Sequence, residues 1–258
     1  MGLEIHQFIC LEDNFGLLLH DDHSGETASI DAPDGEAIAA EAKRLGWRLT
    51  HVLLTHHHLD HIQGVPALRS AFPGLVVVGA HKDAHRLNGV DVLVGEGDVV
   101  AIGPTLARVL ETPGHTTGHL AYYFLEDEAV FVGDTLFSLG CGRVFEGTME
   151  TMYNSLEKLA ELPDETRVYC GHEYTQANAR FALTVDPENP MLAERAREVD
   201  ELRSAGKYTL PTTIALERAT NPFLRAEDQL VQTAMGMSDD DPVEVFARMR
   251  ERKNDFRG

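Results

Sequence analysis

The sequence predicts an α/β fold that is followed by a purely helical C-terminal segment. Two observations support this class. Up to about residue 170, short apolar runs alternate with turn signals and amphipathic stretches, which is the pattern of strands mixed with helices. After about residue 174, the strand pattern disappears and helical spacing alone remains. We therefore expect a first domain at residues 1–174 and a helical domain at residues 175–258.

The individual elements follow from local patterns. Strands are expected where aliphatic, β-branched or aromatic runs lie between turn residues, at 3–9, 15–20, 27–31, 51–54, 75–78, 98–102, 105–111, 119–124, 129–132 and 167–170. A first helix is expected at 35–46, because Ile38, Ala42 and Leu45 have the spacing of one helical face. Further helices are expected at 62–71, 150–162, 174–184, 189–205, 212–219, 225–235 and 241–254.

Composition restricts the class of protein. The chain has 258 residues, 43% of them hydrophobic, which suits one large domain or a main domain with an appendage. It shows neither a membrane-spanning run nor a secretory signal, and its three cysteines, Cys10, Cys141 and Cys170, form no close pair. The net charge of −20 argues against nucleic acid as a partner. We expect a cytoplasmic monomer that binds neither nucleic acid nor membranes.

The charge is unevenly distributed. Residues 248–258 carry five cationic side chains against two acidic ones. Cations at the end of a helix suit its dipole, but a basic patch on an acidic protein also suits the docking of a small anion. Charge alone slightly favours the first interpretation.

The segment Thr55–His61 is the strongest chemical signal in the chain. It reads Thr-His-His-His-Leu-Asp-His and directly follows the expected strand 51–54. Because alternate side chains of an extended loop point the same way, His56 and His58 can reach one metal ion, while Asp60 and His61 turn toward a second. His57 lies on the other side of the loop and is not expected to be a ligand.

Three later turns carry similar chemistry. His115, Asp134 and His172 each follow an expected strand, and each is directly preceded by a glycine, which permits a tight turn. Taken singly, a His or Asp in such a turn is more often a structural hydrogen bonder. Three strand-Gly-ligand units downstream of the Thr55–His61 motif favour a metal site.

Taken together, the chain resembles the metallo-β-lactamase superfamily and, within it, the glyoxalase II (hydroxyacylglutathione hydrolase) family. The resemblance rests on Thr-His-His-His-Leu-Asp-His, Thr-Pro-Gly-His-Thr, Val-Gly-Asp-Thr-Leu-Phe, Gly-Cys-Gly-Arg, Gly-His-Glu-Tyr-Thr and the helical tail. It implies a four-layer αββα sandwich with a C-terminal helical domain.

The resemblance also implies a ligand set for two divalent metal ions. His56, His58 and His115 would hold the first ion, Asp60, His61 and His172 the second, and Asp134 would bridge both. A set of imidazoles and carboxylates without thiolate suits Zn²⁺ and tolerates Fe or Mn. In the enzymes that this chain resembles, a hydroxide shared by the metals attacks the substrate carbonyl. Asp60 would orient this hydroxide and Asp134 would bridge the metals, so both are expected catalytic residues.

Substrate contacts are implied for four further residues: Arg143, Tyr174, Arg250 and Lys253. The i, i+3 spacing of Arg250 and Lys253 places both on one helical face, where they could bind glutathione carboxylates. Arg143 stands in place of the usual Lys, and Phe145 stands where Tyr is common, so one hydroxyl contact is expected to be missing.

The expected function is hydrolysis of S-(2-hydroxyacyl)glutathione, typically S-D-lactoylglutathione, to glutathione and D-lactate, the second step of methylglyoxal detoxification. Alternatives on the same fold are a persulfide dioxygenase with one iron, which is expected to lack a full helical C-terminal domain, and a lactonase or β-lactamase. A non-catalytic metal or glutathione binder is a further alternative, and a turnover assay separates it.

Overall fold

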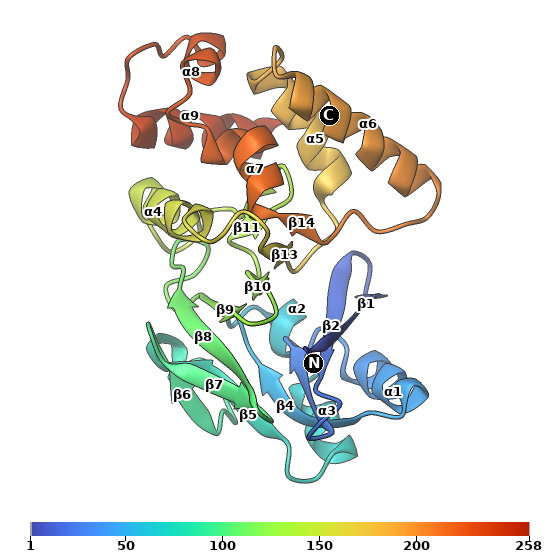
Figure 1. Cartoon of the computed structure of the whole chain (residues 1–258). Helices are drawn as coiled ribbons and strands as arrows, with labels where there is room; N and C mark the ends of the chain where they lie inside the picture. Colours follow the sequence, from blue (N-terminus) through green and yellow to red (C-terminus); the bar gives the residue numbers. More distant parts are fainter. Residues whose placement is uncertain (1, 258) are drawn as a thin grey trace. The chain divides into compact units, whose positions relative to one another are not determined.

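The computed structural model describes residues 2–257, which form two compact units (Figure 1). Within the described residues, the first unit consists of residues 2–111 and 116–133, and the second of residues 112–115 and 134–257. The division into domains at residues 174 and 175 stays a prediction.

The first unit is built on a mixed sheet in the order β1-β2-β3-β4-β5-β6 (Figure 1). Its strands are β1 Glu4–Cys10, β2 Asn14–His20, β3 Glu26–Ile30, β4 Arg48–Leu53, β5 Val76–Ala80 and β6 Val92–Val94. The first three strands are antiparallel neighbours, whereas β3 to β6 run parallel. The carboxyl ends of β3 and β4 therefore meet at one edge, where the segment Thr55–His61 begins.

Four antiparallel strands complete the β-structure of this unit. They are β7 Val99–Ile102, β8 Thr105–Glu111, β9 Leu120–Phe124 and β10 Ala129–Phe131, each paired with the next. All five residues of β9 are buried, which is the burial expected of a strand covered on both faces.

Helix α1 (Gly35–Leu45) matches the expected helix closely. The Asp34 carboxylate accepts hydrogen bonds from the backbone N–H groups of Glu36 and Ala37, and Gly46 ends the helix with φ of 77°. The predicted core face is confirmed for Ile38 and Ala42, which pack in a cluster with Leu68, Val52 and Val77.

The expected helix 62–71 is instead two helices, α2 (Leu59–Ile62) and α3 (Val65–Ala71). Pro66 has no N–H to donate to the carbonyl of Ile62, so one continuous helix is broken here. Gly64, between the helices, approaches α1 so closely that a Cβ would lie 2.3 Å from the backbone nitrogen of Gly35. The one-turn η1 (His81–Asp83) follows β5.

The second unit is mainly helical. Its short strands are β11 Leu136–Phe137 and β12 Gly140–Cys141, which form a hairpin, and β13 Arg167–Tyr169, which pairs with β14 Thr212–Thr213. Its helices are α4 Met149–Ala160, α5 Thr175–Val185, α6 Pro190–Ser204, α7 Ile214–Thr220, η2 Pro222–Leu224, α8 Gln229–Met235 and α9 Pro242–Asp255.

Two expected helices of this unit differ from prediction. The segment 212–219 starts as β14, because Thr212 and Thr213 pair with Val168 and Arg167 before α7 begins. The segment 225–235 contains only α8, which begins after Asp228, whose carboxylate accepts from the backbone N–H of Leu230.

The core of the second unit holds a buried carboxylate. Glu217 on α7 accepts hydrogen bonds from the Ser138 hydroxyl and the Leu139 backbone N–H at 2.8 Å each, and from Thr212 and Asn221 at 2.7 and 3.0 Å. Burial nevertheless raises the pKa of Glu217. These bonds fix α7 against the segment between β11 and β12.

The three cysteines are buried free thiols. Burial raises the pKa of Cys10 to about 12 and also raises the pKa of Cys141 and of Cys170. Among the helices of residues 2–257, none is long and apolar enough to cross a bilayer.

Candidate metal centre

In the first unit, a buried carboxylate fixes the Thr55–His61 segment. Asp31 directly follows β3 and accepts hydrogen bonds from the backbone N–H of Thr55 (2.7 Å), the Thr55 hydroxyl (2.8 Å) and Nδ1 of His61 (2.8 Å). Its φ of 58° lies in the left-handed region, which Asp tolerates better than most residues. No sequence motif marks Asp31, although it follows a strand, as Asp134 does.

His56 and His58 lie side by side, as the alternation of the loop predicts. Nε2 of His56 is 3.1 Å from Nδ1 of His58. The other ring nitrogen of His56, Nδ1, is 3.0 Å from the Thr55 hydroxyl. Nδ1 of His56 is therefore held by the Thr55 hydroxyl, while Nε2 of His56 faces Nδ1 of His58.

Asp60 and His61 also lie together, at the start of α2. Oδ2 of Asp60 is 3.6 Å from Nε2 of His61. Asn14, a buried residue of β2, donates from Nδ2 to this oxygen at 3.2 Å and to the Asp60 carbonyl at 3.1 Å. Asn14 thus sets the direction of the Asp60 carboxylate, and no sequence motif marked it.

In the second unit, His115, Asp134 and His172 form a buried cluster. Oδ2 of Asp134 is 3.6 Å from Nε2 of His115 and 3.3 Å from Nε2 of His172. This cluster therefore brings one carboxylate oxygen and two imidazole nitrogens together as potential metal ligands.

The loop after β12 supports this cluster. Nδ1 of His115 lies 2.9 Å from the carbonyl oxygen of Arg143, to which it can donate, leaving the Nε2 lone pair for a cation. Gly142 is required here, because a Cβ would lie 1.9 Å from the Asp134 carbonyl oxygen. Of the three predicted glycine turns, Gly114 (φ 141°) and Gly133 (φ 48°) have positive φ, whereas Gly171 does not.

These donor sets fit divalent metal ions. Two ligand atoms about 2.0–2.1 Å from a tetrahedral Zn²⁺ lie ~3.3 Å apart, close to the separations of 3.1 Å for His56 and His58 and 3.3 Å for Asp134 and His172. Donor atoms of Asp31, His56 and His61 also lie within 4.8 Å of one another, with Asp31 bonded to Nδ1 of His61 and thus supporting that histidine. The second ring nitrogens of His56, His61 and His115 are held by a hydroxyl, a carboxylate and a carbonyl, as is usual for metal-binding histidines.

The two predicted cations of α9 have different environments. Arg250 is 3% exposed, donates from Nη1 to the Cys141 carbonyl at 2.7 Å, and lies over the ring of Phe223. Lys253 is partly buried and donates to the Ala177 carbonyl at 3.1 Å. Burial, together with the charge of Arg250, lowers the pKa of Lys253 to about 8.

Two aromatic side chains border the histidines of the second unit. The ring of Tyr174 stacks on His172 with centroids 4.7 Å apart and an interplanar angle of 3°. Phe145 is 60% exposed, and its ring centroid lies 5.2 Å from that of His115. Arg143 is exposed on the same loop as Phe145. These side chains are accessible to a molecule that approaches the histidines.

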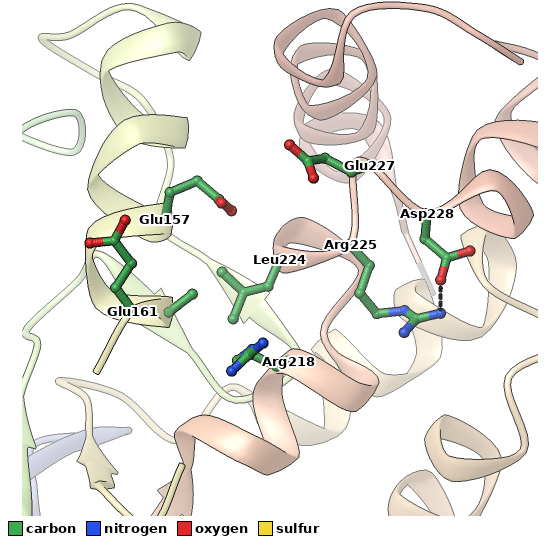
Figure 2. Close-up of a pocket in the computed structure, with 8 residues that line it drawn as sticks. Glu157, Glu161, Arg218, Leu224, Arg225, Glu227 and Asp228 are labelled. Carbon is green, nitrogen blue, oxygen red and sulfur yellow. Dashed lines mark hydrogen bonds and ion pairs between the residues drawn. The ribbon is translucent and has the colours of Figure 1, made fainter. Parts of the chain in front are cut away.

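A separate cavity of about 450 Å³ in the second unit contains no predicted site residue (Figure 2). It is lined by Glu157, Ala160, Glu161, Arg218, Leu224, Arg225, Glu227 and Asp228. Burial, followed by the charges of Glu227 and Glu161, raises the pKa of Glu157. Arg225 donates to Asp228 at 2.7 Å, so part of the acidic charge is compensated. Figure 2 marks this bond with a dashed line.

Comparison with known proteins identifies the family. Residues 20–172 match the metallo-β-lactamase superfamily, and residues 173–256 match the C-terminus of hydroxyacylglutathione hydrolase. A hydroxyacylglutathione hydrolase of Chelativorans sp. (strain BNC1) is 52% identical over 99% of this chain and 100% of that protein. One from Rhodopseudomonas palustris (strain BisA53) is 54% identical over 98% of this chain and 99% of that protein. This chain belongs to the hydroxyacylglutathione hydrolase family.

Solved structures agree with the family. ETHE1 from Myxococcus xanthus has a TM-score of 0.61 at 32% identity, covering 85% of this chain and 96% of its own. The BLEG-1 B3 metallo-β-lactamase has a TM-score of 0.66 at 26% identity, covering 86% and 99%. The predicted αββα fold class with a helical C-terminal region is confirmed. Fold and donor groups together show a site suited to divalent metal.

Proposed function

We propose that this chain hydrolyses the thioester of S-(2-hydroxyacyl)glutathione, typically S-D-lactoylglutathione, to glutathione and a 2-hydroxy acid (D-lactate), the second step of methylglyoxal detoxification. The observation that carries the proposal is similarity to hydroxyacylglutathione hydrolases over nearly the full length of both chains. The match of residues 173–256 favours this activity over a persulfide dioxygenase, lactonase or β-lactamase. A monomeric state and a cytoplasmic location stay predictions.

The proposed cofactor is a pair of divalent metal ions, with Zn²⁺ as the best match and Fe or Mn as alternatives. His56, His58 and His115 would hold the first ion, and Asp60, His61 and His172 the second, with Asp134 shared. Support comes from the ligand types and from the donor-atom separations inside each unit.

The metal ions and the residues of the chain would have separate roles in the reaction. When bound, divalent ions polarise the thioester carbonyl and acidify water, which makes a nucleophile available at neutral pH. Asp60, held by Asn14, would orient the attacking water. An ordinary thiol has a pKa of about 8.5, so the glutathione thiolate can depart without a general acid.

Glutathione recognition is proposed for Arg143, Tyr174 and Lys253 by direct contact, and for Arg250 by an indirect role. The first three are at least partly accessible, so they would contact the substrate directly, with Arg143 and Lys253 attracting carboxylates. Arg250 is buried against the Cys141 carbonyl, so we assign it to fixing the loop that carries Arg143. Phe145 offers an apolar contact and no hydroxyl.

The test is a thioesterase assay on S-D-lactoylglutathione with metal analysis of the same preparation. We expect turnover to require metal and to reach its maximum near two equivalents per chain. A preparation with two equivalents of metal that leaves every 2-hydroxyacylglutathione intact would overturn the proposal. The assay also separates an enzyme from a protein that only binds glutathione or metal.

A further inference from the structure

Both ring nitrogens of His57 are bonded to charged side chains. Nδ1 of His57 lies 3.1 Å from Oδ2 of Asp83, and Nε2 lies 3.1 Å from Nη1 of Arg86. Asp83 and Arg86 also pair with each other, Oδ1 to Nη2, at 3.0 Å. We name His57, Asp83 and Arg86 the His57 clamp. Asp83 is fully buried, while the Arg86 side chain is 29% exposed.

The partners assign the ring proton of His57. A guanidinium can only donate, so Nε2 of His57 must accept from Arg86. A carboxylate accepts, so Nδ1 carries the proton and donates it to Asp83. His57 is thus held as the neutral Nδ1–H tautomer with no lone pair left for a metal. This explains why the middle histidine of three does not join its neighbours.

The clamp has a rigid base. The Asp83 carbonyl accepts from the backbone N–H groups of Arg86 (2.8 Å) and Leu87 (3.0 Å), which closes a turn. Gly118 packs against the Asp83 carboxylate, and a Cβ there would lie 2.4 Å from Cγ. The next residue, His119, stacks on His56 with ring centroids 4.9 Å apart. The clamp and His56 are therefore braced by the same short segment.

We propose that Asp83 and Arg86 are positioning residues for the metal site and act through His57. Because successive side chains of the loop alternate in direction, anchoring His57 on one side turns His56 and His58 to the other, where their nitrogens lie 3.1 Å apart. This inference rests on the proposed metal role of His56 and His58. Loss of the clamp lowers metal affinity by about 10- to 100-fold, the range found for residues that support metal ligands.

The experiment compares Arg86→Leu, Arg86→Lys and Asp83→Asn in the full chain. Metal affinity is measured by competition with a chromophoric chelator, and ligand geometry by the absorption spectrum of the Co²⁺-loaded protein. We expect Arg86→Leu to weaken Co²⁺ and Zn²⁺ binding by about tenfold or more and to change the Co²⁺ spectrum. Arg86→Lys keeps one donor for Nε2 of His57, so it should recover part of the affinity.

A matched control is Arg69→Leu. The Arg69 side chain is 34% exposed and pairs with Asp91 in the same unit, at 2.6 Å. Its loss removes an arginine ion pair without changing the clamp, so metal affinity should stay within about twofold of the parent. An equal loss in Arg69→Leu and Arg86→Leu would show a general effect on stability and overturn the inference.

The outcomes separate this inference from the proposed function. The metal site stands if the parent binds two ions and His58→Ala loses one of them. If, in addition, both Arg86→Leu and Asp83→Asn bind metal with parental affinity and spectrum, the clamp alone is refuted. If His58→Ala leaves metal binding unchanged, the metal site itself is refuted. Should Asp83→Asn fail to fold, the Arg86 variants still decide, because the Arg86 side chain is partly exposed. Imidazole ¹⁵N spectra that show His57 as the Nε2–H tautomer would also refute the clamp.

Discussion

Asp31 should be needed for metal binding by His61 more than for folding, and Asp31→Asn tests this. The substitution keeps the side-chain volume and suits the positive φ of 58°, which Asn also tolerates. It leaves one acceptor oxygen in place of two. In the parent, Oδ1 accepts from the Thr55 backbone N–H, while Oδ2 accepts from the Thr55 hydroxyl and from His61.

The magnitude follows from these bonds. If the amide oxygen keeps the Thr55 N–H, the amide NH₂ replaces Oδ2, 2.8 Å from Nδ1 of His61. His61 must then accept at Nδ1 and carry its proton on Nε2, which leaves no lone pair there for a cation. One hydrogen bond to a charged group contributes about 1.5–3 kcal/mol. We expect this loss in the free energy of unfolding of the metal-free protein, well below the ~5–15 kcal/mol of a typical domain.

The assay is denaturant unfolding of the metal-free proteins, with metal content measured on parallel loaded samples. Asp21→Asn is the control, because Asp21 is a similarly buried carboxylate of the same unit that accepts from the Ser24 backbone, the Ser24 hydroxyl and Thr105. It should lose comparable stability and keep its metal. A full metal complement in Asp31→Asn, or equal metal loss in Asp21→Asn, would refute the reasoning.

Three further outcomes are expected. Asp134→Ala removes the oxygen between His115 and His172, so metal content and activity should both fall, and an active, fully loaded variant would contradict the shared-ligand role. The pKa of Lys253 is lowered to about 8, so this side chain loses its charge as pH rises through that value. The KM for S-D-lactoylglutathione should therefore increase between about pH 7 and 9, and Lys253→Arg should flatten this rise. Equal pH profiles of KM for the parent and Lys253→Arg would contradict the assignment. The folded-state pKa of Glu157 is raised, so the folded state binds more protons than the unfolded state and its stability falls as pH rises through that pKa. Glu157→Gln should therefore raise the free energy of unfolding near neutral pH. Removing the repulsion from Glu161, one helical turn away, contributes ~0.2–0.5 kcal/mol of this gain. Urea unfolding should show no gain near pH 4.

The sequence identified residues whose role follows from local spacing. The alternation of Thr55–His61 placed His56 beside His58, and helical spacing placed Ile38 and Ala42 in the core. Such periodicities depend only on the backbone geometry of a strand or helix, so they can be read without tertiary information.

Other features depend on partners that are distant in sequence. Asn14 reaches Asp60 across 46 positions, and no local pattern distinguishes it from a surface asparagine. The resemblance implies a substrate contact for Arg250, whereas this side chain is buried and donates to the carbonyl of Cys141, 109 residues away. Strands of two residues, such as β11 and β14, are defined by their pairing and not by their own propensity.

The alkylation rates of the three buried thiols depend on local opening of the structure around them. Alkylating reagents attack thiolates, and the elevated pKa values of Cys10, Cys141 and Cys170 keep all three protonated while they are enclosed. Cys10 belongs to one compact unit and the other two to its companion. The labelling rate of each cysteine in the native protein should therefore report how often its own unit opens locally, without any engineered probe.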